Sequence, residues 1–118
     1  MRIAGSLLKL GNFTAAALHN TVEYTGVNQQ ITVPNGAMAA YHDLVISGTG
    51  AVFPTSLQVN GDFTVNSPVD FSGKTIVMDG SELQHIGGTG NIQFNHLTVN
   101  NSNEGVVLST NITVSGLL

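Results

Sequence analysis

The stretch Thr-Val-Glu-Tyr-Thr-Gly at residues 21–26 returns as Thr-Ile-Val-Met-Asp-Gly at residues 75–80. Two further pairs of blocks recur at nearly the same distance along the chain: residues 41–47 with 94–100, and residues 57–61 with 112–116. A unit of about 55 residues therefore occurs twice. Long repeats of this kind are typical of arrays in which each unit buries its apolar side against a neighbour.

The spacing of the apolar residues predicts β-strands. Apolar and polar residues alternate over short runs, which is the pattern of a strand with one buried face. The strand centres fall near six valines that follow one another at short intervals along the chain: Val22, Val45, Val59, Val77, Val99 and Val114. We therefore expect an all-β fold, a parallel β-helix (β-solenoid) of about six rungs, with adjacent rungs about 4.8 Å apart.

The whole chain is expected to form one β-solenoid segment over residues 1–118, with repeat 1 at about 5–60 and repeat 2 at about 61–115. Two small antiparallel β-sandwich repeats are the alternative, because Asn35-Gly36 and Asn60-Gly61 are hairpin signals. A sandwich built from one such unit would have a very small core. The solenoid is therefore the preferred interpretation.

The composition excludes several classes of function. Charged residues make up 8% of the chain, and the net charge is −4. The basic residues are Arg2, Lys9 and Lys74, so nucleic-acid binding is excluded, because neutralising phosphates requires clustered Lys and Arg. With no cysteine, the chain forms neither disulfides nor Cys-based zinc sites. No apolar run is long enough to predict a membrane span.

The two ends of the sequence fall at the same point of the repeat. Ile3-Ala4-Gly5 aligns with Val59-Asn60-Gly61 and with Val114-Ser115-Gly116. The first residues also lack the apolar run and cleavage site of a signal peptide. We therefore expect an excerpt of a longer array whose targeting signals lie outside this segment, and we expect its ends to pair with neighbouring repeats or with further copies of itself.

The acidic and histidine residues do not predict catalysis or a metal site. Glu23 and Asp79 fall at nearly equivalent repeat positions, where we expect them on one face about three rungs, or about 14 Å, apart. That separation is too long for the paired carboxylates of a glycosidase. The four histidines do not align between the units, which argues against a repeated metal site: His19, His42, His85 and His96. No enzyme activity, cofactor or metal is expected.

Four residues are the candidates for surface contact with a ligand: Tyr24, Tyr41, Asn95 and Asn101. Outward tyrosines can stack on sugars, and exposed Asn side chains can bind glycans by hydrogen bonds. In the repeat, Tyr24 corresponds to Met78 and Tyr41 to Phe94. An apolar residue at both positions of each pair favours packing of the two tyrosines in the core. For the Asn-rich segments the sequence leaves two alternatives open, an internal amide ladder and an exposed polar face.

Nearly the whole chain resembles a known kind of repeat. Residues 94–102 read Phe-Asn-His-Leu-Thr-Val-Asn-Asn-Ser, and residues 105–116 read Gly-Val-Val-Leu-Ser-Thr-Asn-Ile-Thr-Val-Ser-Gly. This pattern resembles the repeats of large surface proteins from Bacteroidetes, which include gliding-motility adhesins and other cargo of the type IX secretion system. Residues 12–31 resemble the companion block of that repeat, whereas residues 34–40 and 68–71 depart from it. The resemblance implies an extracellular β scaffold and carries over no catalytic residue.

Two functions remain for the structure to address. The first is a structural or adhesive repeat segment of a secreted bacterial cell-surface protein, which forms a stiff rod or filament. The second is a carbohydrate-binding or carbohydrate-cleaving β-helix module. The expected partners are other repeats of the same protein or further copies, and surface glycans under the second hypothesis.

Overall fold

The computed structural model describes residues 1–7 and 11–118 and places them in an all-β fold without a helix. Residues 8–10, which include Lys9, lie outside the described part. In the described residues the strands are β1 (Arg2–Ile3), β2 (Thr21–Tyr24), β3 (Ala40–Tyr41), β4 (Asp43–Ile46), β5 (Ser56–Val59), β6 (Phe63–Val65), β7 (Thr75–Met78), β8 (Gln84–Gly88), β9 (Ile92–Phe94), β10 (His96–Val99), β11 (Val106–Leu108) and β12 (Ile112–Val114).

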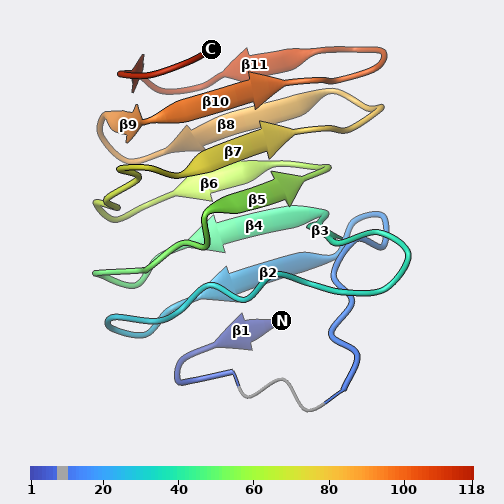
Figure 1. Ribbon diagram of the computed structural model, residues 1–118, viewed down its shortest axis with the longest axis vertical. Helices are drawn as coiled ribbons and strands as arrows, with labels where there is room; N and C mark the ends of the chain where they lie inside the picture. The colour runs from blue at the N-terminus through green and yellow to red at the C-terminus, as the bar shows by residue number, and fades with distance from the viewer. Residues whose placement is uncertain (8–10) are drawn as a thin grey trace.

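The strands form three parallel sheets that are the faces of one coil. The first sheet has the order β1-β2-β4-β6-β8-β11, the second β3-β5-β7-β10, and the third contains β9 and β12. Figure 1 shows the strands rising in chain order from β1 to β11, with the arrows of the first and second sheets pointing in opposite directions. Each turn passes from the first sheet through the third face to the second, as in the succession β8, β9 and β10.

The parallel β-helix is confirmed, with about five turns instead of about six. Among the strand pairs, the shortest turn leads from Ala40 to Gln58 and the longest from Phe63 to Ile86. The sequence overestimated the number of rungs because it treated every strand centre as one rung. Val45 in β4 and Val59 in β5 instead lie on different faces.

The antiparallel sandwich alternative is wrong for the described residues, because every strand pair there is parallel. Asn60-Gly61 does not close a hairpin. The strands on either side of it, β5 and β6, belong to the second and first sheets. The two residues instead form a corner at which the coil changes face.

The sequence repeat is not a whole number of turns of the coil. Val22 pairs with Leu44, which in turn pairs with Phe63, so two turns lead from Val22 to Phe63. A third turn leads on to Ile86. The repeat partner of Val22 is Ile76, which falls between these two positions. Equivalent residues therefore change face along the chain, as the following three do: Ile3 lies in β1 of the first sheet, Val59 in β5 of the second, and Val114 in β12 of the third.

This rotation corrects the expected position of two acidic residues. Glu23 lies in β2 of the first sheet, whereas Asp79 follows β7 of the second sheet. The sequence suggested that the two carboxylates share a face, and this expectation is wrong. They remain unsuited to act as a catalytic pair, now because they lie on different sides of the coil.

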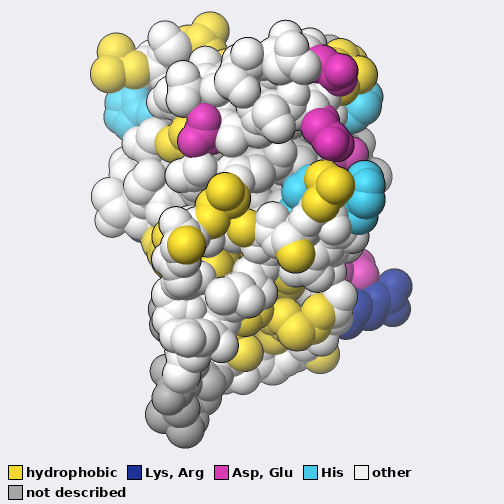
Figure 2. Space-filling model, turned by 90° about the vertical axis from the view of Figure 1, so that its right-hand side faces the viewer, with side chains coloured by type: hydrophobic (Ala, Val, Ile, Leu, Met, Phe, Trp, Pro, Cys, Tyr) yellow, Lys and Arg dark blue, Asp and Glu magenta, His cyan; other side chains and the backbone are white. Residues whose placement is uncertain are grey.

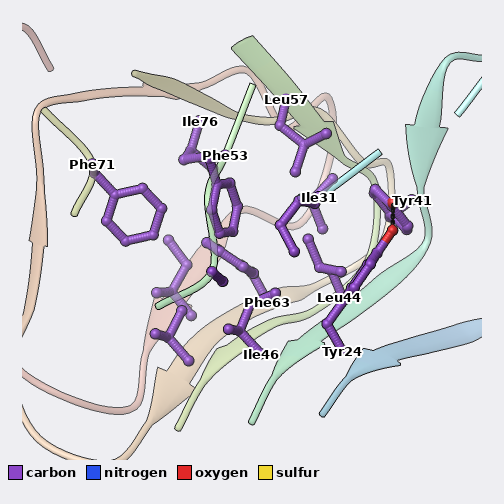
Figure 3. Close-up of a cluster of buried hydrophobic side chains, with 14 of the residues drawn as sticks. Tyr24, Ile31, Tyr41, Leu44, Ile46, Phe53, Leu57, Phe63, Phe71 and Ile76 are labelled. Atoms are coloured by element: carbon purple, nitrogen blue, oxygen red, sulfur yellow. Dashed lines mark hydrogen bonds between the residues drawn. The ribbon is translucent and has the colours of Figure 1, made fainter. Parts of the chain in front are cut away.

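The core lies inside the coil and is lined by every second residue of the strands. β4, β5 and β7 each alternate between partly exposed or exposed and buried positions. The interior contains a group of four phenylalanines whose neighbouring ring centroids are 4.9 to 6.3 Å apart: Phe53, Phe63, Phe71 and Phe94. Figure 3 shows side chains from β2, β4, β5, β6 and β7 pointing into this shared interior.

Phe63→Ala tests the contribution of this aromatic group. The Phe63 side chain is fully buried and contacts the rings of Phe53, Phe71 and Phe94. Removing a buried Phe side chain leaves a cavity, so we expect the free energy of unfolding to fall by about 3–5 kcal/mol. The measurement is urea denaturation. The neighbouring, outward-facing Thr64→Ala is the control and should change stability by about 0.5 kcal/mol or less; equal effects would contradict this description of the core.

Candidate functional site

The tyrosines that the sequence proposed for surface contact are buried. Tyr24 is 1% exposed and Tyr41 is 0% exposed. Their hydroxyl oxygens are 2.8 Å apart (Figure 3), and the Tyr41 hydroxyl donates to the carbonyl of Thr32. Burial, together with the hydrogen bond to Tyr24, raises the pKa of Tyr41, so its phenol stays protonated. The core packing that the repeat partners Met78 and Phe94 favoured is confirmed, and the candidate surface role of Tyr24 and Tyr41 is wrong, because an apolar ring with a paired hydroxyl is stable inside the coil.

Asn95 and Asn101 are partly buried, and both side chains bond to the adjacent coil. The Asn95 amide accepts from the Gly73 nitrogen at 3.0 Å and donates to the Ser115 hydroxyl at 3.2 Å. The Asn101 amide donates to the Glu82 carbonyl at 2.7 Å and accepts from the Gly105 nitrogen at 2.7 Å. These contacts give both side chains a structural role between coils.

Sequence reasoning missed the two buried glutamines, Gln29 and Gln84, which are 6% and 0% exposed. The Gln84 side chain donates to the carbonyls of Val59 and Gly61 at 3.0 and 2.8 Å and accepts from the Gly80 nitrogen at 3.0 Å. Gln29 makes the same three contacts at the equivalent place in the first unit, with Ile3, Gly5 and Gly26. We call this arrangement the glutamine clamp.

Gly26 and Gly80 make the clamp sterically feasible. A Cβ atom at Gly26 would lie 2.1 Å from the Ala4 carbonyl oxygen, and one at Gly80 would lie 2.2 Å from the Asn60 carbonyl oxygen. Each would also be 2.9 Å from the clamp glutamine's side-chain carbon. The available signal in the sequence was therefore a glycine in each unit followed three or four residues later by a glutamine: Gly26 by Gln29 and Gly80 by Gln84.

Gln84→Leu tests the clamp. The substitution removes the side-chain partner of the Gly80 nitrogen and of the Gly61 carbonyl while keeping a similar volume. Because a buried polar group without a partner costs about 1–3 kcal/mol, we expect at least that loss in the free energy of unfolding. Urea denaturation measures it. Gln93→Leu replaces an exposed glutamine in β9 and is the matched control; a loss as large in the control would contradict the clamp.

Acidic and histidine side chains follow one edge of the coil, as Figure 2 shows on its right-hand side. Asp43 accepts from the Asp62 backbone nitrogen at 2.9 Å, and Asp62 accepts from the His85 backbone nitrogen at 2.8 Å. His42 Nδ1 lies 2.9 Å from Asp43, and His85 Nδ1 lies 3.2 Å from Asp62. The carboxylates thus pair with backbone N–H groups where the chain turns from the second sheet to the first.

The same backbone contact recurs in the second unit with a different side chain. His96 Nδ1 accepts from the Leu117 nitrogen at 2.8 Å. In the repeat, His96 corresponds to Asp43 and Leu117 to Asp62, so this contact corresponds to the one between Asp43 and the Asp62 nitrogen. The backbone nitrogen at this repeat position is therefore bonded to a carboxylate in the first unit and to an imidazole in the second. Within residues 1–7 and 11–118, no group of three or more His, Cys, Asp or Glu side chains is placed to hold a metal ion.

Glu23 connects three successive strands of the first sheet. Its carboxylate accepts from the Ser47 hydroxyl at 2.7 Å and pairs with Arg2 Nε at 2.7 Å. The Ser47 hydrogen bond, helped by Arg2, lowers the pKa of Glu23 below its usual value of 4.5. A lowered pKa in the folded state adds stability above the unfolded-state pKa, and this stability is lost as pH falls through the folded-state pKa.

Ser47→Ala tests this electrostatic arrangement. The variant loses the hydrogen bond that is the largest cause of the shift, so we expect the pKa of Glu23 to rise toward 4.5. The measurement is an NMR titration of the Glu23 side-chain carboxyl carbon. As a second readout, Glu23→Gln should lower stability at pH 7 and make less difference once the pH is below the pKa of Glu23 in the folded chain. An unchanged titration in Ser47→Ala would disprove the assigned cause.

A shallow hollow lies on the third face. It has a volume of about 320 Å³, and Pro68, Val69, Phe71, Asn91 and Gln93 contribute to its lining. An adjoining hollow of about 570 Å³ includes Asn95, Thr113 and Ser115. Exposed amide and hydroxyl groups therefore occur beside apolar surface, but Phe71 itself is only 2% exposed.

The last coil presents an apolar edge. Ile112 and Val114 of β12 are partly exposed, whereas their partners Ile92 and Phe94 in β9 are buried. Leu117 and Leu118 are 75% and 85% exposed. The Ser115 nitrogen donates to the Phe94 carbonyl, so by alternation the N–H and C=O groups of Val114 point away from β9. This edge has the backbone groups and the apolar side chains that a further coil needs.

In the part of the chain that the structure describes, there is no helix that could cross a membrane. Comparison with protein-family models, with curated proteins and with solved structures gives no match for this chain.

Proposed function

We propose that this chain is a structural repeat segment of a secreted bacterial cell-surface protein, in which it forms part of a stiff rod used for adhesion or as a stalk. The observation that carries the proposal is the parallel ladder that runs without interruption through all six strands of the first sheet. In such a coil each turn is supported by the turns on either side. The extracellular location and the link to type IX secretion rest on the resemblance of the repeats.

The use of the polar and aromatic residues supports a structural role. Six of the seven aromatic side chains are buried: Tyr24, Tyr41, Phe53, Phe63, Phe71 and Phe94. Asp43 and Asp62 accept backbone hydrogen bonds, and Asp79 accepts from Gln58 and Asn100 at 2.8 Å each. Residues that would serve a sugar-stacking surface or a catalytic pair are thus committed to holding coils together.

Carbohydrate binding is the second candidate, and the hollow on the third face favours it. Asn91, Gln93 and Thr113 are exposed there and offer hydrogen-bonding groups. The burial of the nearby Phe71 ring leaves little surface for stacking against a sugar. This candidate therefore ranks below the structural role.

A fusion of two copies tests the structural role. Residue 118 is equivalent to residue 7, so a second copy that starts at residue 8 directly after residue 118 keeps the repeat in phase. We expect this fusion to unfold in one transition at a higher temperature than the single chain. We also expect small-angle X-ray scattering to show a particle longer by about 25 Å, because the added turns rise about 4.8 Å each.

The control joins two complete copies through a long Gly/Ser linker and should unfold at the temperature of the single chain. If the in-phase fusion instead behaves as two independent bodies, the structural proposal is wrong. A glycan array probed with the single chain addresses the second candidate. Binding that is lost in Gln93→Ala would favour the carbohydrate function.

A further inference from the structure

We propose that the exposed edge of β12 binds a second copy of this chain by taking the place of that copy's β1, so that copies join head to tail. The inference rests on the proposed structural function and identifies the partner. It follows from the repeat, because residues 112–116 occupy the same repeat positions as residues 1–5.

The contacts of β1 define what its replacement must supply. The Met1 carbonyl accepts from the Glu23 nitrogen at 2.7 Å, and the Ile3 carbonyl accepts from the Thr25 nitrogen at 2.9 Å. The Gln29 side chain donates to the carbonyls of Ile3 and Gly5 at 2.9 and 2.6 Å. All of these acceptors are backbone groups, so a strand of similar shape can provide them.

The middle of the chain shows that a β12-like segment makes these contacts. The Val59 carbonyl accepts from the Asp79 nitrogen at 3.0 Å, and Gln84 clamps the carbonyls of Val59 and Gly61. On its other edge this segment donates from Asn60 and Gly61 to the carbonyls of Tyr41 and His42. One edge of the segment thus pairs with the preceding coil and the other with the following coil.

β12 is held on its inner edge in the same way. The nitrogens of Ser115 and Gly116 donate to the carbonyls of Phe94 and Asn95 at 3.0 and 2.8 Å, as those of Asn60 and Gly61 do to Tyr41 and His42. Its outward edge therefore offers the carbonyls of Val114 and Gly116 in the positions that the clamp glutamine recognises in both units. The Gln29 side chain of a second copy matches this edge.

The exchange costs little because β1 is a short strand at the edge of the first sheet. It has two residues and pairs with β2 alone. Val114 replaces the buried Ile3, and Ile112 replaces Met1, so both positions stay apolar. Leu118 takes the position of Leu7, which is partly buried and packs against the core, so one leucine replaces another there. The lost Arg2–Glu23 pair has an Arg2 side chain that is 79% exposed, and such pairs contribute little.

A contact that joins unlike surfaces does not close on itself. The edge of β12 binds the β2 side of the next copy, whose own β12 edge is then available for another copy. Heterologous contacts of this kind generate open filaments. The proposal therefore predicts growth in one direction without a fixed number of subunits.

Disulfide cross-linking of the full chain tests the exchange, since the natural sequence contains no cysteine. Arg2 pairs with Glu23, so after exchange Thr113 of one copy lies opposite Glu23 of the next. The double variant Thr113→Cys/Glu23→Cys should form a ladder of dimers, trimers and larger species when oxidised with glutathione disulfide. Each single variant should form dimers at most. Circular dichroism checks that the variants fold.

Two further variants make the result specific. Val114→Pro in the double-cysteine chain removes the outward N–H group and should abolish species larger than the monomer, while the inner edge of β12 keeps its bonds. Arg2→Cys/Ser109→Cys reports direct stacking of β1 on β11 without exchange, because Ser109 follows Leu108 at the edge of the first sheet.

Multimers from the 113/23 pair that Val114→Pro abolishes would support the proposal. Multimers from the 2/109 pair in place of the 113/23 pair would overturn the exchange. Absence of multimers from both pairs would overturn self-association. Neither negative result affects the outcome of the fusion experiment, which tests the structural function without association of separate chains. Failure of this inference is therefore distinguishable from failure of the structural function.

Discussion

The parallel backbone ladder between successive coils is the interaction on which the rest of this structure depends. Each coil provides hydrogen-bonding partners for the next, from Ala40 opposite Gln58 to Phe63 opposite Ile86. The ladder fixes the register between coils. Because of this register, side chains at equivalent positions of successive coils lie directly above one another. Most inward positions are therefore apolar, and the group of four phenylalanines is the clearest result. A substitution of a buried residue in one coil therefore alters the packing of the adjacent coils.

The corners of the coil need hydrogen-bond partners of their own, because backbone N–H and C=O groups at a corner lie outside the ladder. The glutamine clamps serve two corners with uncharged side chains that both donate and accept. Asp43, Asp62 and His96 serve another type of corner as acceptors. Among the described residues no buried side-chain nitrogen or oxygen lacks a hydrogen-bond partner. These acidic, histidine and glutamine side chains thus have a structural role as hydrogen-bond partners of backbone groups at the corners.

The sequence predicted the architecture better than the positions of individual side chains. Alternation identified β2, β4 and β7, and the repeat pointed to stacked coils. Alternation carries no information about which face a strand joins, so neither the rotation of equivalent residues between sheets nor the five turns could be predicted. The repeat partners Met78 and Phe94 indicated the burial of Tyr24 and Tyr41, but the pairing of their hydroxyls could not be predicted because it forms only in three dimensions. The clamp role of Gln84 was missed because its acceptors, the carbonyls of Val59 and Gly61, lie in the preceding coil.

The most direct test of the account is the set of backbone nuclear Overhauser effects between strands, measured by NMR on the isotope-labelled chain. The account predicts inter-strand contacts of the parallel type, between Leu44 and Phe63 in the first sheet and between Ile76 and Leu97 in the second. It also predicts that the Gln84 side-chain amide protons lie close to residues Val59 and Gly61. Antiparallel contacts between β5 and β6 across Asn60-Gly61 would contradict the coil and the functional proposals built on it.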